Sequence, residues 1–139
     1  MKIPRFLGAA AMTFGLLLVA VPSFAHHSYT AEFDANNCRD FTGTLSRIEW
    51  QNPHGFFYVD IKDASGSVEN WSFQTNALIV LKRNGIERQL FVENIGKAVW
   101  VRGCLAKNGK KNYAVAGTLK FASDGLLRQM SGLQDQPGG

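Results

Sequence analysis

The stretch 43–63 most constrains the fold, because it holds two strand-like runs separated by a corner. In the second run, apolar residues recur at every second position: Phe57, Val59 and Ile61. This two-residue period is typical of a half-buried strand. The corner is Asn52-Pro53-His54-Gly55. Because Pro53 has no N–H and keeps Asn52 out of helical conformations, we predict a hairpin that turns sharply here.

The first run changes its facing part-way along. Phe41 and Leu45 share one face of an ideal strand, whereas Ile48 and Trp50 fall on the other. A long strand that buries both pairs needs an extra residue, so we predict a β-bulge near Ser46-Arg47. A long, bulged first strand that turns into a second is typical of a small closed barrel.

Residues 1–25 are predicted to be a cleaved signal peptide. Lys2 and Arg5 give a positive start, residues 6–21 are apolar and uncharged, and Ser23-Phe24-Ala25 resembles a cleavage site. The alternative is a transmembrane anchor, which the apolar run of under ~18 residues disfavours. We expect an exported protein that begins at His26.

Export bears on the charge and on the cysteines. The chain has 15 basic and 11 acidic residues, and two of the basic ones leave with the signal peptide. This small excess gives no reason to expect a nucleic-acid partner.

The chain has two cysteines, Cys38 and Cys104. In an oxidising compartment we predict a disulfide between them; the alternative is two free thiols, one of them buried.

The predicted elements are five strands and one short helix. The strands fall at 39–50, 55–62, 67–74, 98–105 and 112–121, and the helix at 77–83, between the third strand and the fourth. Asn76 is its expected N-cap and Asn84-Gly85 its C-terminal stop. This order predicts an all-β fold, a five-stranded OB-fold-like barrel. Because the first and fourth strands pair in such a barrel, Cys38 and Cys104 should reach the same rim.

This interpretation divides the chain into four parts. Residues 1–25 are the signal peptide and 26–38 an N-terminal arm. The barrel follows at 39–127. The polar, glycine-rich end, 128–139, is expected to be a disordered tail.

Several short motifs together resemble a known family. They are His26-His27-Ser28, Glu32-Phe33-Asp34, Gly43-Thr44, Glu49-Trp50, Asn52-Pro53-His54, Tyr58-Val59-Asp60 and Asn70-Trp71-Ser72-Phe73. The pattern resembles the exported bacterial proteins of domain-of-unknown-function family 6152 and covers most of the chain after residue 25. The resemblance implies a periplasmic protein and brings no established activity, substrate or catalytic residue. Cys38 and Cys104 depart from the family pattern.

The three histidines suggest a metal site. His26 and His27 stand at the predicted start of the mature protein, and His54 stands at the corner. A terminal histidine offers its amine and its ring nitrogen as a chelate. With a second imidazole, this set suits Cu(II) and, less well, Ni(II) or Zn(II). Residues 28–38 are long enough to fold back to the corner. The alternative is that His26 and His27 are solvated and His54 is a turn residue.

Aromatic residues suggest a second type of site. The aromatic group consists of Trp50, Phe56, Tyr58, Trp71 and Trp100. Four of them are candidates for a ligand-binding face on the barrel: Trp50, Phe56, Tyr58 and Trp100. The alternative function is therefore a non-catalytic envelope domain that binds a glycan or a protein partner. These side chains could instead complete a second small core beneath the arm. We find no Ser-His-Asp order, Cys-His pair or phosphate loop in the sequence, so a non-catalytic protein is expected.

Overall fold

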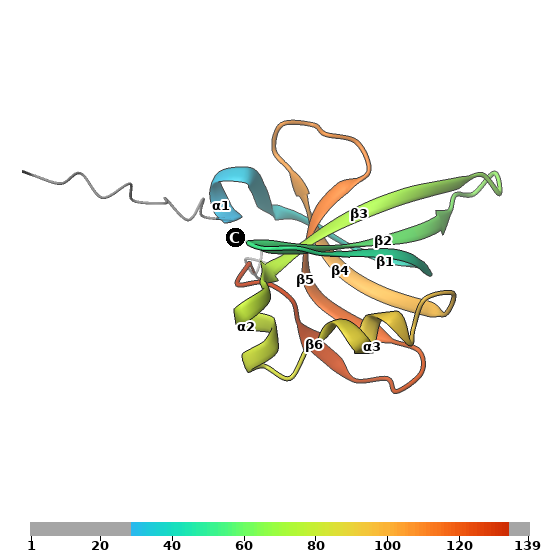
Figure 1. Cartoon of the computed structure of the whole chain (residues 1–139). Helices are drawn as coiled ribbons and strands as arrows, with labels where there is room; N and C mark the ends of the chain where they lie inside the picture. Colours follow the sequence, from blue (N-terminus) through green and yellow to red (C-terminus); the bar gives the residue numbers. More distant parts are fainter. Residues whose placement is uncertain (1–28, 134–139) are drawn as a thin grey trace, which may run out of the picture.

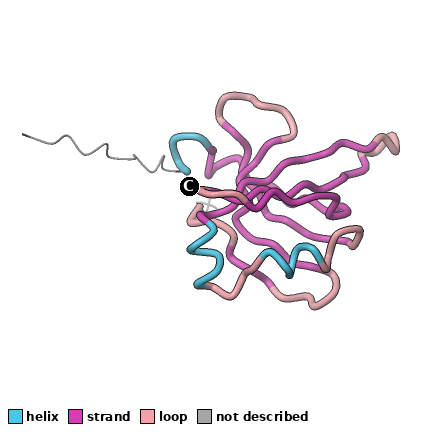
Figure 2. The backbone as a smooth tube through the Cα atoms, in the orientation of Figure 1, coloured by secondary structure: helices cyan, strands magenta, loops and turns pink. Residues whose placement is uncertain are grey.

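The computed structural model describes residues 29–133, which form six strands and three short helices (Figures 1 and 2). In chain order these are α1 (Tyr29–Glu32), β1 (Phe33–Trp50), β2 (His54–Lys62), β3 (Val68–Ala77), α2 (Leu78–Arg83), α3 (Arg88–Val92), β4 (Ala98–Ala106), β5 (Tyr113–Phe121) and β6 (Leu127–Gln129). The prediction of a mainly β protein is confirmed. The predicted signal peptide, 1–25, lies outside the described residues.

β1 carries the predicted bulge. Leu45 pairs with Val59 and Arg47 with Tyr58, so Ser46 is the extra residue on β1. The bulge restores the inward facing of the strand. Phe41 and Leu45 are buried in the main core, and Ile48 and Trp50 pack against the same core from beyond the bulge.

The strand pairings return to their starting point. The sheet has the order β3-β2-β1-β4-β5-β6, with neighbouring strands antiparallel. In addition, Ser72–Gln74 of β3 pair in parallel with Tyr113–Val115 of β5. The pairings therefore run from β1 through β2, β3, β5 and β4 back to β1, and the sheet curls around its core.

The main core fills the inside of the curled sheet. Phe57 of β2 stacks on Phe73 of β3, with 5.2 Å between ring centroids. Leu81 of α2 and Phe91 of α3 are fully buried in the same cluster. The two short helices are thus held by burial of a few large side chains, because neither is long enough to be stable alone.

A smaller core lies between α1 and the sheet. Its buried members are Phe33, Cys104, Ala106, Tyr113, Val115 and Leu133, and Tyr29 packs against them. Because Phe33 is fully buried here, β1 begins six residues before the predicted start at 39. The arm predicted at 26–38 is therefore, from Tyr29 on, a helical turn and the start of β1. Residues 26–28 lie outside the described part.

The C-terminal part is ordered further than predicted. β6 pairs with β5, and Met130 after it is fully buried. The Met130 N–H donates to Gly117 O at 2.8 Å, and its carbonyl accepts from the Asn76 N–H at 2.6 Å. The prediction of a disordered tail from 128 is wrong as far as Leu133, because Met130 supplies core contacts. Residues 134–139 lie outside the described chain.

The predicted helix after β3 is present, with a different N-cap. Ala77, not Asn76, occupies the N-cap, and no side chain caps the helix. Asn76 instead accepts a hydrogen bond from the Ala77 N–H at 2.9 Å. The predicted stop is confirmed: Asn84 is the C-cap, and Gly85 has a φ of 73°, which favours glycine.

Cys38 and Cys104 form the predicted disulfide. The two residues are direct register partners on β1 and β4. The bridge therefore fastens two strands that already share a ladder. In the part of the chain from 29 to 133, no helix is long and apolar enough to span a membrane.

Candidate functional site

The corner between β1 and β2 is fixed by contacts with the end of β3. The Asn52–Pro53 peptide bond is cis. Pro53 O accepts a hydrogen bond from the Leu78 N–H at 3.3 Å, and His54 pairs with Ala77. The corner, α1 and α2 lie at the same end of the molecule in Figure 1, away from the β2–β3 turn. The backbone thus holds His54 in a defined position.

His54 donates from one ring nitrogen to the backbone. Its Nδ1 lies 3.2 Å from Thr75 O, an atom that can only accept, so Nδ1 carries the hydrogen. In the neutral imidazole, Nε2 then keeps the free lone pair. A histidine whose Nδ1–H is bonded to a backbone carbonyl has the arrangement in which proteins commonly present Nε2 to a metal.

Tyr29 contacts the same carbonyl and the His54 ring. Its hydroxyl donates to Thr75 O at 2.9 Å, and the two rings meet edge to face with centroids 6.1 Å apart. Burial, and then the nearby Glu32 carboxylate, raise the pKa of Tyr29 to about 12, so the hydroxyl stays a neutral donor. The first described residue of the chain is therefore packed beside His54.

The other two predicted ligands, His26 and His27, lie outside the described residues. Among residues 29–133, no group of three or more His, Cys, Asp or Glu side chains is placed to hold a metal ion. His54 is thus the single predicted metal ligand whose surroundings the structure describes.

A second polar cluster ties α1 to the sheet. The Tyr113 hydroxyl lies 2.9 Å from Glu32 Oε1 and 2.5 Å from Gln74 Oε1. Burial, followed by the hydrogen bond and charge of Glu32, raises the pKa of Tyr113. Sequence reasoning missed Tyr29, Glu32 and Tyr113. The available signal was the spacing of Tyr29 and Phe33, four residues apart as on one helix face, whose rings lie 6.4 Å apart.

The four candidate aromatic residues have different surroundings. Trp50 packs on Phe91 of α3, with centroids 5.4 Å apart. Phe56 packs against the smaller core beneath α1. The other two each lie beside a cation: Arg47 lies over the Tyr58 ring, and Lys120 lies near the Trp100 ring. The structure therefore does not bring the four together as one binding face.

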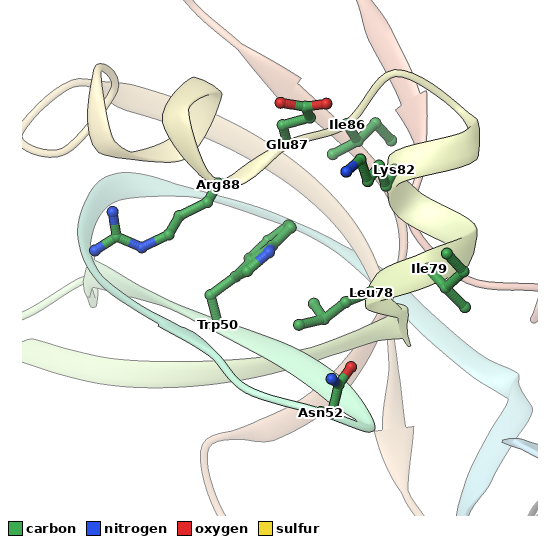
Figure 3. A pocket seen from close by; sticks show the side chains of 8 residues that line it. All are labelled: Trp50, Asn52, Leu78, Ile79, Lys82, Ile86, Glu87 and Arg88. Atoms are coloured by element: carbon green, nitrogen blue, oxygen red, sulfur yellow. The ribbon is translucent and has the colours of Figure 1, made fainter.

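A cleft borders Trp50 at the corner. It has a volume of about 370 Å³ and lies between the corner, α2 and the start of α3 (Figure 3). Its lining consists of Trp50, Asn52, Leu78, Ile79, Lys82, Ile86, Glu87 and Arg88. Of the candidate aromatic residues, Trp50 is the one that lines this cleft.

The sequence also matches a family model. The model described as "Family of unknown function (DUF6152)" matches residues 13–115, more than half of the chain. The chain belongs to this family. Membership confirms the resemblance inferred from the histidine and Trp-Gln-Asn-Pro-His motifs. Comparison with curated proteins and with solved structures found no match. The DUF6152 assignment brings no activity or ligand, so function has to be argued from the site.

Proposed function

We propose that this DUF6152 protein is an exported, periplasmic binding module that holds a metal ion through His26, His27 and His54, with Cu(II) as the first candidate. The main support for this proposal is the contact between the rings of Tyr29 and His54. It places the chain that follows the two terminal histidines directly beside the third histidine.

The fold supports a binding role. The circular order of pairings, the bulged β1 and the helices between β3 and β4 support our interpretation of the fold as an OB-fold-like barrel. In such barrels the loop between the first two strands is a usual ligand-binding loop. His54 belongs to this loop region, at the first position of β2.

Chain length permits the three histidines to meet. Only Ser28 lies between His27 and Tyr29, a span of at most about 7 Å, and His26 is one residue further. With Nδ1 donating to Thr75 O, the Nε2 atom of His54 is available as a ligand. The free amine and ring of His26 would supply a chelate, and the set of nitrogen ligands suits Cu(II).

The proposal is tested by Cu(II) titration of three metal-free proteins. The first begins at His26, the second keeps one Met ahead of His26, and the third carries His54→Ala. Both changes should weaken binding by about tenfold or more, since each removes one nitrogen ligand. Binding should also weaken as the solution is acidified, because a protonated imidazole or amine cannot ligate.

Loss of binding through misfolding has to be separated from loss of a ligand. His54→Asn places an amide nitrogen where Nδ1 stands and so keeps a donor to Thr75 O while removing Nε2. It should melt near the wild-type temperature and bind Cu(II) as weakly as His54→Ala. Equal Cu(II) affinity in the wild type, the Met-extended protein and both His54 variants would refute the chelate.

A further inference from the structure

The cleft beside Trp50 combines an apolar floor with a charged rim. Its floor is made by Trp50 of β1, Leu78 of α2 and Ile86 of the connection between α2 and α3. Lys82, Glu87 and Arg88 stand around it, and the Trp50 indole lies in the middle of the group in Figure 3. A concave apolar surface with a few polar groups is typical of a site for a small ligand.

The floor is built before any ligand arrives. Trp50 is backed by the buried Phe91 ring, and Ile86 is 3% exposed. The Ile86 N–H donates to Leu81 O at 2.9 Å, which closes the turn after α2. A preformed floor lowers the conformational cost of binding.

The rim carries an excess of positive charge. Lys82 lies in the last turn of α2, before Gly85, and Arg88 is the first residue of α3, after it. Neither forms an ion pair within residues 29–133, and Glu87 is the one acidic residue that lines the cleft. Two cations without carboxylate partners flank an indole. An anionic ligand with an apolar body therefore complements this surface in both charge and shape.

We propose that this cleft binds a small aromatic carboxylate, with its ring against Trp50 and its carboxylate at the rim that carries Lys82 and Arg88. The volume of about 370 Å³ lies near the lower end of the range for ligand sites, which fits a single ring and a short acid chain. The same chemistry is offered by a free aromatic acid and by the C-terminal aromatic residue of a peptide. His54 does not line the cleft, and the proposal does not depend on the metal site.

The test uses four probes on metal-free protein with chelator present. They are 3-phenylpropionate, its neutral amide, the tripeptide Gly-Gly-Phe with a free carboxylate, and the same peptide amidated. Binding is followed by chemical-shift changes of backbone amides around the cleft. At least one acid should bind with a dissociation constant on the order of 1 mM, and its amide about tenfold more weakly. The acid that binds more tightly identifies the source.

Charge variants separate the cleft from general electrostatic attraction. Lys82→Gln and Arg88→Gln should each weaken acid binding about three- to tenfold. Arg83→Gln is the matched control, because Arg83 is also exposed, follows Lys82 in α2 and does not line the cleft. It should leave the affinity unchanged. Absence of binding by both acids, equal binding of acid and amide, or an equal effect of Arg83→Gln would overturn the proposal.

Discussion

At the scale of single residues, Gly43 shows how closely β1 and β2 approach just before the bulge in β1. A Cβ atom at this position would lie 2.3 Å from Asp60 O and 2.8 Å from Val59 Cγ1. Since backbone cannot move aside easily, Gly43→Ala should destabilise the fold by about 1–3 kcal/mol, measured by thermal or urea unfolding. Gly132→Ala, with nothing within 4 Å of the added atom, should change stability by less than about 0.5 kcal/mol. Similar melting temperatures for both variants would contradict the close approach.

Residue patterns predicted part of the candidate site. The corner motif predicted the sharp turn before His54, because Pro53 restricts Asn52 whatever the tertiary structure. The partners of His54 could not be found this way. Tyr29 donates a hydrogen bond to the carbonyl of Thr75, 46 residues further along the chain. This contact depends on how α1 folds onto the sheet. For the same reason Phe56, on the outward parity of β2, is covered by the smaller core.

At the scale of elements, the β5–β6 hairpin contains an ion pair between Asp124 and Arg128. Arg128 donates to both carboxylate oxygens of Asp124, and the Leu126 N–H donates to Oδ1 at 2.9 Å. The Arg128 hydrogen bond is the main reason why the pKa of Asp124 lies below its usual value. Because the folded pKa is the lower one, the pair stabilises the fold above the unfolded value of about 3.9 and loses this contribution as the pH falls through the folded pKa.

Asp124→Asn should therefore remove part of the acid sensitivity of the protein. Melting temperatures measured between neutral and strongly acidic pH should converge for the variant and the wild type at the acidic end. In an Arg128→Gln background, the same Asp124→Asn change should have little effect on the pH profile, because the main cause of the pKa shift is already gone. An unaltered pH profile in Asp124→Asn would show that the hairpin does not use this pair.

Elements with one well-buried face were predictable within one to three residues. β2 and the first part of β4 alternate because the sheet curls around the core, and burial then follows the two-residue period. β5 is buried throughout its first half and alternates only towards its end. The first residues of β1 show no such period, since Phe33 is buried and the next five are not. β6 has three residues, and Leu127 is 67% exposed. The first six residues of β1 and the whole of β6 had no periodic signal, so sequence analysis missed them.

At the scale of the whole molecule, the disulfide links β1 to β4, two neighbouring strands of the curled sheet. Cys38 and Cys104 are 66 residues apart in sequence and adjacent in register. The β1–β4 pairing was predicted from the order of the elements, whereas the parallel β3–β5 pairing joins segments that no local pattern connects. The bridge thus constrains a long loop in the unfolded chain without requiring the folded ladder to change.

Reducing this bridge should lower the stability of the entire domain. Closing a loop of this length contributes about 4 kcal/mol in the chain-entropy model, and even half of that corresponds to a fall of roughly 10 °C in melting temperature. Melting with and without reductant measures the effect, and Cys38→Ala/Cys104→Ala protein, which has no bridge, should not respond to reductant. The double variant should melt near the reduced wild type. An equal response of both proteins to reductant, or two titratable thiols in the denatured, unreduced wild type, would show that the bridge does not stabilise the domain.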